Sequence, residues 1–208
     1  MKKNNICIID YGVGNFFSIY KFIKKIDINT IVSNNYRTIE CSKCIILPGV
    51  GSFTSAITFL KKNNLINLIK KKSEEGTKII GICLGMQIMM TYGNENGYTS
   101  GLNFFKGEAV KIKKNKNYKI PNIGIRDLRI NTGKKNNFLK RFTKKNFYFL
   151  HSYKVDIIKE NVLGWSHMGD FKYDIPAIIQ KKNIFGLQFH PEKSNNEGFL
   201  FFRELLKK

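Results

Sequence analysis

The chain has 208 residues, of which 42% are hydrophobic, and a formal net charge of +21. This composition fits one globular domain over residues 1–208 and excludes a disordered chain. No apolar run approaches transmembrane length and no signal-peptide core follows Met1, so we expect a cytoplasmic protein without membrane contacts. Its four cysteines form no dense framework, and disulfides are not expected.

The positive charge is spread along the chain rather than concentrated in one segment. Lysine runs such as 70–72 and 113–114 fall near the ends of predicted elements, without an arginine-rich recognition helix or a stacking signature. Because Lys, Asn, Ile and Phe share AT-rich codons, we attribute the charge to genome composition and expect no nucleic-acid partner. A basic nucleic-acid-binding module is the alternative, and it predicts steeply salt-dependent binding.

The first half of the sequence alternates predicted strands and helices. In chain order, we expect strand 6–9, helix 16–26, strand 30–32, strand 44–47, a helix capped by Ser52 and running toward Lys72, strand 77–82, and a helix from Gly85. This alternation indicates an α/β fold with an open, mainly parallel sheet flanked by helices.

From Gly107 onward the pattern changes to shorter strands with polar turns. They are expected at 147–150, 153–156 and 177–180, and a terminal helix at about 198–206. The segments 113–119 and 132–137 are expected to be loops. The second half therefore adds short antiparallel strands to the main sheet.

Cys83 falls at the turn between a predicted strand and a predicted helix. It is flanked by Gly81 and Gly85, the small residues that a nucleophile elbow needs. The start of a helix favours a thiolate, which attacks carbonyl carbons. By the same geometry, the backbone N–H of Leu84 can stabilise an oxyanion.

Two loops, 10–15 and 48–51, follow other predicted strands. Carboxyl ends of parallel strands share one edge of a sheet, so both loops should converge on Cys83. The glycines of 48–51 allow backbone N–H groups to turn toward this site. The loops therefore predict an oxyanion hole beside the thiol.

His190 and Glu192 lie far downstream of the elbow. If this segment is extended, residues two apart share a face, so Glu192 can orient His190 while His190 takes a proton from Cys83. A core cysteine and a satisfied core histidine are the alternative for each residue taken singly. The three types together indicate cysteine-based acyl transfer.

Two other motifs are weak. Gly12-Val13-Gly14 lacks the third glycine of a dinucleotide-binding loop, because Phe17 occupies that position. Cys41 and Cys44 have the spacing of half a zinc or redox site, but no second cysteine pair exists. We therefore expect neither a metal nor a cofactor.

The segments 81–87 and 188–194 resemble the triad motifs of class I glutamine amidotransferases. More narrowly, they resemble glutaminase subunits of imidazole glycerol phosphate synthase. The segments 10–15, 48–53 and 151–153 also match the pattern of these subunits, in the same order. The likeness covers nearly the whole chain. It implies that Cys83 attacks the side-chain amide of glutamine and forms a thioester with release of ammonia.

The resemblance also implies roles for other residues of the site. His190 would shuttle protons and Glu192 would hold its ring. By the same likeness, backbone N–H groups of Val50 and Leu84 would form the oxyanion hole. Gln87 and Glu95 would bind the amino-acid end of glutamine.

The resemblance implies a heterodimer with a (β/α)₈ cyclase subunit of the HisF type. Asn15 and Lys193 would face this partner. That subunit joins ammonia to a phosphorylated nucleotide, giving imidazole glycerol phosphate and an aminoimidazole carboxamide ribotide in L-histidine biosynthesis. The chain has no spare length and no phosphate-binding signature for this step, which independently indicates a second polypeptide.

One segment departs from the family pattern. Where these subunits usually carry Gly-Trp-Asn, this chain has Gly124-Ile125-Arg126. The departure leaves open a related glutaminase that supplies ammonia to a sugar amidotransferase in surface-polysaccharide synthesis. A stand-alone cysteine hydrolase, independent of Gln87 and Glu95, is a further alternative.

Overall fold

The computed structural model describes residues 6–12, 16–26, 29–49, 51–114, 116, 118–131, 137–168 and 173–207. Within these ranges, eight strands form the main sheet: β1 (Ile6–Ile9), β2 (Thr30–Ser33), β3 (Cys44–Leu47), β4 (Lys78–Ile82), β9 (Arg129–Ile130), β12 (Val162–Met168), β13 (Tyr173–Lys181) and β14 (Ile184–Leu187). Their spatial order is β2-β1-β3-β4-β14-β13-β12-β9. The first five are parallel and the last three antiparallel.

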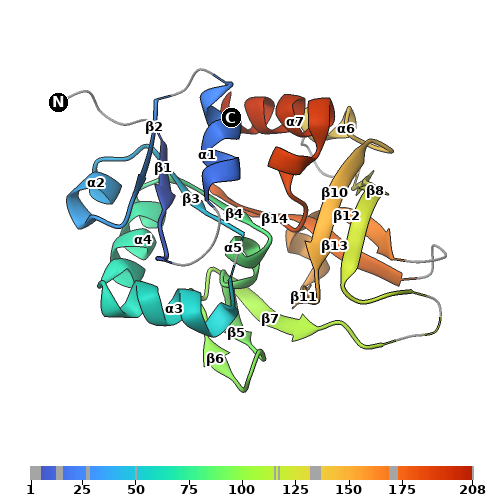
Figure 1. The fold of residues 1–208 in the computed structure, drawn as a ribbon, viewed down its shortest axis with the longest axis horizontal. Coiled ribbons are helices and arrows are strands. Elements are labelled where there is room, and N and C mark those ends of the chain that lie inside the picture. The colour runs from blue at the N-terminus through green and yellow to red at the C-terminus, as the bar shows by residue number, and fades with distance from the viewer. Residues whose placement is uncertain are drawn as a thin grey trace.

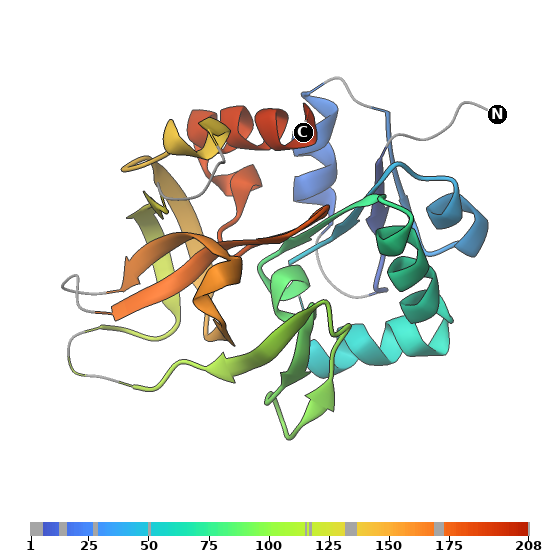
Figure 2. The same cartoon turned by 180° about the vertical axis from the view of Figure 1, so that it is seen from behind.

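Helices cover both faces of the parallel strands. In chain order they are α1 (Phe17–Lys24), α2 (Tyr36–Glu40), α3 (Phe53–Lys62), α4 (Leu65–Glu74), α5 (Leu84–Gln87), α6 (Asn137–Lys140) and α7 (Asn195–Lys207), with 3-10 turns η1 (Lys159–Asn161) and η2 (Pro191–Lys193). Figures 1 and 2 show α1 and α7 on one face and α3 and α4 on the other. The observed fold confirms the predicted α/β class.

Two smaller sheets lie beside the main one (Figure 1). The first pairs β8 (Asn122–Asp127) with β10 (Asn146–His151) in antiparallel register. The second has the order β11-β7-β5-β6, from β5 (Met90–Gly93), β6 (Thr99–Ser100), β7 (Phe105–Lys111) and β11 (Tyr153–Ile157). The β5–β7 pair is parallel and the other two pairs are antiparallel, so the expected short antiparallel strands are largely confirmed.

The central strands are buried on both faces. Ile6 and Ile8 pack in the cluster with α1 and α7, whereas Cys7 and Ile9 pack in the cluster with α3 and α4. This arrangement explains why β1 has a continuous apolar sequence instead of an alternating one. Cys44 is buried in the same way at the start of β3.

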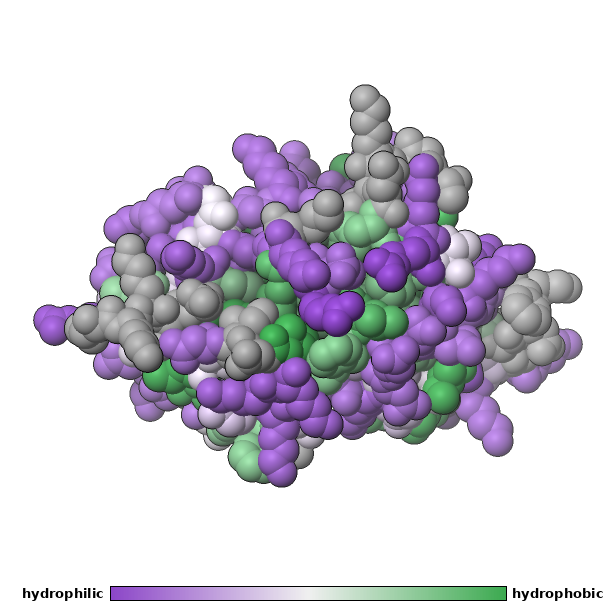
Figure 3. Space-filling view, turned by 90° about the horizontal axis from the view of Figure 1, so that it is seen from above, coloured by the Kyte–Doolittle hydropathy of each residue, from purple (hydrophilic) through white to green (hydrophobic). Residues whose placement is uncertain are grey.

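The outer surface is mainly polar. Seen from above in Figure 3, hydrophilic side chains cover most of the face, and apolar patches are small. No described helix combines the length and apolarity that membrane crossing requires. Hydrophilic residues thus dominate this face of the molecule.

The predicted helix from Ser52 toward Lys72 is wrong in one respect, because two helices occupy this range. Ser52 caps α3 as expected, accepting a hydrogen bond from Ser55 N at 3.2 Å. The chain then breaks at Asn63 and Asn64, and Asn64 has a left-handed backbone with φ 56°. Asn tolerates this conformation better than most residues, so the break lets α4 begin in a new direction.

We predict that Asn64→Ala lowers the free energy of unfolding by about 1 kcal/mol, because a Cβ-bearing residue without a local polar group is strained at positive φ. Asn64→Gly should leave it nearly unchanged, since glycine adopts this backbone freely. Urea denaturation of both variants is the measurement. Equal losses in the two variants would contradict backbone strain as the cause.

Candidate active site

Cys83 sits at a strained turn between β4 and α5. Its backbone has φ 49° and ψ −103°, a combination that L-residues rarely adopt. A Cβ on Gly81 would lie 2.5 Å from the carbonyl of Gly85, and a Cβ on Gly85 would collide with the Leu47 carbonyl oxygen. Glycine is therefore required on both sides of the thiol, as the sequence predicted for an elbow.

The helix that follows Cys83 is much shorter than expected. It spans only Leu84–Gln87, and the chain enters β5 at Met90. One helical turn aligns few peptide dipoles, so the macrodipole contributes little to the stability of a thiolate. The side chains around the sulfur must supply most of that stabilisation.

Besides the ring of His190, two polar groups interact with the sulfur of Cys83, which is 6% exposed. The thiol donates to the carbonyl oxygen of Leu150 with a separation of 3.6 Å. The side-chain Nε2 of Gln188 donates to Sγ, also at 3.6 Å. The backbone N–H of Cys83 donates to the Leu187 carbonyl at 2.6 Å, which fixes the turn against β14.

His190 and Glu192 form a buried pair next to the elbow. Nδ1 of His190 lies 2.8 Å from Oε1 of Glu192, and their side chains are 4% and 8% exposed. A carboxylate only accepts, so Nδ1 carries the hydrogen and Nε2 is left to exchange a proton with the thiol. The expected extended segment is wrong, because Pro191 opens the 3-10 turn η2, and this turn brings the two side chains together.

The His190 backbone is fastened to β10. Its N–H donates to the Tyr148 carbonyl at 2.8 Å, and its carbonyl accepts from Ser194 Oγ at 2.6 Å. Ser194 Oγ in turn accepts from the Tyr148 N–H at 2.9 Å. These bonds limit the freedom of the imidazole relative to β10, whose Leu150 carbonyl contacts the sulfur.

Two buried histidines near the elbow hold opposite charge states. Burial alone would lower the pKa of His190, but interactions of its ring with the Cys83 sulfur and the Glu192 carboxylate raise the pKa to about 10. Burial lowers the pKa of His151 to about 4; its bond to the Tyr153 carbonyl opposes this shift and the His190 charge adds to it. At neutral pH His190 is charged and His151 is neutral.

Cys83 opens into a hollow of about 320 Å³. This volume is at the lower end for small-molecule pockets, about 300–1,000 Å³. The lining residues come from the elbow, the loops after β3 and β5, the residue before β8, and the end of β10 with the start of β11: Gly49, Gly51, Cys83, Leu84, Gln87, Glu95, Pro121, Leu150, His151, Ser152 and Tyr153. Cys83, Leu84, Gln87 and Glu95, all predicted site residues, thus share one cavity.

The two predicted substrate-binding side chains are held in place by backbone groups. Gln87 Nε2 donates to the Tyr153 carbonyl at 3.1 Å. Oε2 of Glu95 accepts from the Phe53 N–H at 2.6 Å, at the start of α3. Thr54 Oγ1 also donates to the Glu95 carbonyl at 3.3 Å. The carboxylate therefore has a fixed position at the rim of the hollow.

Five predicted residues are not among the described lining residues: the buried pair His190 and Glu192, and also Lys193, Val50 and Asn15. Lys193 is exposed on η2, with its Nζ 5.6 Å from the centre of the Tyr148 ring. Val50 and Asn15 lie outside the described residues, although the flanking Gly49 and Gly51 line the hollow. Of the loop 10–15, the described residues 10–12 do not reach this cavity.

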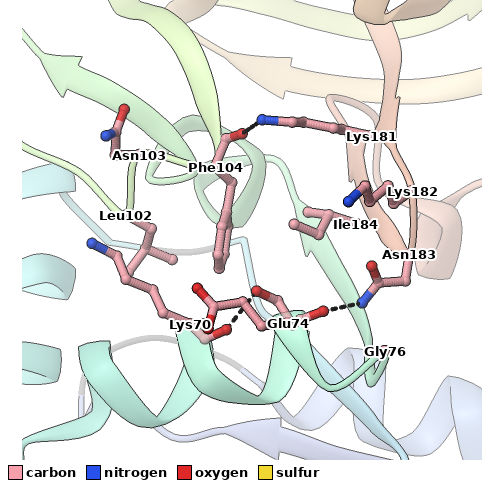
Figure 4. A pocket seen from close by; sticks show the side chains of 11 residues that line it. Lys70, Glu74, Gly76, Leu102, Asn103, Phe104, Lys181, Lys182, Asn183 and Ile184 are labelled. Carbon is pink, nitrogen blue, oxygen red and sulfur yellow. Dashed lines mark hydrogen bonds between the residues drawn. The ribbon is translucent and has the colours of Figure 1, made fainter.

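A larger hollow of about 460 Å³ lies at the opposite end of β4 (Figure 4). Phe104 and Ile184 contribute apolar side chains to it, and Lys181 is tied to the Phe104 carbonyl at 3.2 Å. Asn183 Nδ2 donates to the carbonyls of Ser73 and Thr77. The polar groups of this larger hollow thus stabilise the packing of α4 against β14. The Cys83 thiol opens into the smaller cavity instead.

The profile of the family Glutamine amidotransferase class-I matches residues 7–208. The chain belongs to the class I glutamine amidotransferases. This glutamine amidotransferase is 37% identical over 206 residues to the imidazole glycerol phosphate synthase subunit HisH of Bacillus subtilis, covering 97% of this chain and 95% of the relative. The HisH subunit of Lactococcus lactis subsp. lactis is 38% identical over 208 residues, covering 100% and 97%.

Solved structures share the fold of this amidotransferase. A crystal structure described as a glutamine amidotransferase matches with a TM-score of 0.74 and 17% identity, covering 97% of this chain and 99% of the other. The structure of PurLQS from Thermotoga maritima matches with 0.73 and 20% identity, covering 99% and 98%. The predicted resemblance to class I amidotransferases and to their HisH subunits is confirmed.

Sequence reasoning assigned no role to Gln188 and His151 of this amidotransferase. Gln188 stands two residues before His190, a spacing that places both on one face of a strand. His151 belongs to the motif 151–153, but only the structure reveals its bonds to Asn122 Nδ2 at 2.9 Å and to the Tyr153 carbonyl at 2.8 Å. The period-two spacing was the available signal for Gln188.

We predict that Glu192→Gln lowers the pKa of His190, because the ring loses its carboxylate partner. A histidine NMR titration should give a midpoint near 10 in the unaltered protein and a clearly lower one in the variant. Since the folded-state pKa exceeds the ordinary 6.5, the stability from this proton is complete below 6.5 and is lost as pH rises toward 10.

The matched control is Glu197→Gln, which removes a carboxylate from a surface pair with Lys145 and should leave the His190 midpoint unchanged. An unchanged midpoint in Glu192→Gln would show that the carboxylate does not hold the imidazolium.

Proposed function

We propose that this chain is the glutaminase subunit of an imidazole glycerol phosphate synthase. In this proposal it hydrolyses L-glutamine to L-glutamate and ammonia and delivers the ammonia to a HisF-type cyclase. The observation that carries it is that Cys83 opens into a cavity of about 320 Å³ and interacts with His190, which forms a buried pair with Glu192. The HisH names of relatives at 37–38% identity support the pathway.

The starting state is a Cys83 thiolate paired with the imidazolium of His190, whose Nε2 holds the proton from the thiol, and Glu192 keeps the ring oriented through Nδ1. The thiolate attacks the carbon of the glutamine side-chain amide. A tetrahedral oxyanion forms, which the N–H groups of Leu84 and Val50 stabilise. The raised pKa of His190 favours the thiolate–imidazolium pair at neutral pH.

Collapse of the tetrahedral intermediate breaks the carbon–nitrogen bond. The imidazolium of His190 donates its proton to the leaving nitrogen, releasing ammonia and leaving a glutamyl thioester on Cys83. His190, now neutral, takes a proton from water, which attacks the thioester carbon. The thiolate leaves, glutamate dissociates, and the imidazolium re-forms the starting pair.

Substrate binding is assigned to the polar residues at the rim of the cavity. The Glu95 carboxylate would pair with the ammonium group of glutamine, and Gln87 would bind its amino-acid end. Both side chains line the cavity and are positioned by backbone groups. This preorganisation reduces the ordering cost of binding.

The partner surface is assigned to β8 and β10, beside the mouth of the cavity. Ile123, Ile125 and Leu150 are 50%, 57% and 36% exposed, and Ile123 pairs directly with Leu150 in the sheet. Exposed apolar groups gathered in this way are typical of docking surfaces. Leu150 also lines the cavity, so a cyclase on this surface, with Asn15 and Lys193 facing it, would receive ammonia without release into bulk water.

A cyclase partner of this kind would form a heterodimer and make imidazole glycerol phosphate and an aminoimidazole carboxamide ribotide in L-histidine biosynthesis. We place the complex in the cytoplasm, where a nucleophilic thiol stays reduced.

The second candidate partner is a sugar amidotransferase of surface-polysaccharide synthesis. The observation that favours it is the segment Gly124-Ile125-Arg126, where Arg126 folds back to donate to the carbonyls of Ile125 at 2.9 Å and Ile123 at 3.4 Å. This arrangement differs from the Gly-Trp-Asn pattern expected of the histidine-pathway subunit. The glutaminase chemistry is the same in both proposals.

We predict that glutamate release from glutamine is strongly stimulated by the cyclase from the same genome together with its nucleotide substrate. Cys83→Ala should lower this rate by a factor of about 10³ or more, because the nucleophile is lost. Cys41→Ala, which alters an exposed thiol outside the cavity, is the control and should keep full activity. A coupled glutamate assay measures the rates of the unaltered chain and of the two variants.

Retention of one-tenth of the rate in Cys83→Ala would refute the assigned nucleophile. Activity that requires Cys83 but does not respond to the cyclase would favour the polysaccharide-pathway partner instead.

We predict that Ile125→Asp weakens binding to the cyclase by about tenfold or more, since a charge would be buried at the interface. Ile158→Asp introduces the same charge at a residue of similar exposure, 55%, on another part of the surface, and should bind normally. Isothermal titration calorimetry gives both dissociation constants. Equal weakening by the two variants would contradict the assigned surface.

A further inference from the structure

We propose that Gln188 is a positioning residue whose side-chain N–H holds the sulfur of Cys83 in its reactive, deprotonated form. This role deepens the proposed glutaminase function and rests on it, because it concerns the same nucleophile. The contact itself is Nε2 of Gln188 donating to Sγ at 3.6 Å. Gln188 is fully buried, with 0% exposure, so solvent does not compete for this bond.

The position of Gln188 follows from the pairing of β4 with β14. Ile82 pairs with Leu187 in parallel register, and the Leu187 carbonyl accepts the Cys83 N–H at 2.6 Å. The next residue, Gln188, donates its own N–H to the Ala177 carbonyl at 2.9 Å, which fixes its backbone on β13. Leu187 therefore binds the backbone of Cys83, and the next residue, Gln188, binds its side chain.

The surroundings of the sulfur explain why such a donor is needed. The Leu150 carbonyl oxygen lies 3.6 Å from Sγ and accepts the thiol hydrogen. Once the proton has left, that oxygen faces an anion with its lone pairs and disfavours it. An amide N–H on the same sulfur has the opposite effect, because hydrogen bonds to a charged form favour that form. Gln188 thus offsets the carbonyl of Leu150.

The oxygen of the Gln188 amide argues against the idea that this side chain is present to stabilise the fold. Oε1 of Gln188 is buried without a hydrogen-bond partner among the described residues. A buried unsatisfied acceptor destabilises the folded state, and an apolar side chain of similar size would avoid this cost. The amide is useful at this position chiefly for its N–H, which points at the nucleophile.

Gln188 acts through Cys83 and not on the substrate. It is not among the residues that line the cavity. Removing its N–H should therefore reduce the rate of steps that use the thiolate, with little effect on glutamine binding. A split between kcat and KM is the expected kinetic signature.

The test measures the pH dependence of Cys83 alkylation by iodoacetamide in the full-length chain. A Cys41→Ser background removes the exposed thiol, while burial raises the pKa of Cys7 to about 11 and that of Cys44 to about 12, so neither reacts at lower pH. The titratable group that interacts with the sulfur is His190, which in turn interacts with Glu192 and His151, and all three are present in every variant.

Gln188→Leu keeps the bulk of the side chain and removes the donor. We expect its alkylation midpoint to move up by about one pH unit, which is the scale of one hydrogen bond to a charged group. Its melting temperature should stay the same or rise, because the unsatisfied Oε1 is gone. With glutamine and the cyclase, kcat should fall about tenfold while KM changes less than about twofold.

Gln188→Glu is the second variant and preserves the side-chain shape. Its carboxyl group presents acceptors to the sulfur, so the alkylation midpoint should rise at least as far as in Gln188→Leu. Gln180→Leu, on β13 near Lys182, is the matched control and should keep the midpoint of the parent. A parental midpoint in both Gln188 variants would overturn the proposal.

Alkylation does not require glutaminase turnover, so the two proposals fail separately. A raised midpoint in a chain that does not release glutamate would refute the glutaminase function and retain the Gln188–sulfur contact. An unchanged midpoint in an active glutaminase would refute only the role of Gln188.

Discussion

The strained backbone at Cys83 is the constraint on which the site depends. A residue with φ 49° and ψ −103° persists only where surrounding contacts over-determine it. Here the contacts are the bond from its N–H to Leu187 and the close approach of Gly85 to the Leu47 carbonyl. Because β3, β4 and β14 all take part, the sulfur reaches its place at the sheet edge only when these strands have packed together.

Charge placement around the sulfur follows from burial and from a few directed bonds. His190 retains a proton because its ring interacts with a carboxylate and the sulfur, whereas burial and the nearby His190 charge lower the pKa of His151 despite its bond to the Tyr153 carbonyl. Environments that push two similar groups apart in pKa are typical of sites that move protons. With α5 only one turn long, side chains rather than a helix dipole set the state of the thiol.

Prediction from the sequence succeeded where a local pattern had one structural solution. The apolar run at 44–47 matches β3, and the glycines around Cys83 matched the elbow because no larger residue fits there. It failed where the outcome depends on tertiary contacts. The only local sign of a break in 52–72 is the pair Asn63-Asn64, and Pro191 alone does not show that the turn after His190 is held by the bond from His190 N–H to the Tyr148 carbonyl. Likewise, the bond from Phe53 N–H to Glu95 joins distant segments with no shared periodicity.

Because β4 and β14 are adjacent, the residues that place the catalytic groups are separated in sequence from those that form the proposed partner surface. Cys83 and His190 follow neighbouring strands, so their spacing is fixed by one parallel ladder. The chain between these two strands in sequence, including the β8–β10 surface, forms one long connection from β4 to β14. The entropy of closing such a loop grows only slowly with its length. The exposed side chains of this segment can therefore change to suit different ammonia acceptors, while the backbone of Tyr148 and Leu150 keeps its contacts with His190 and the sulfur.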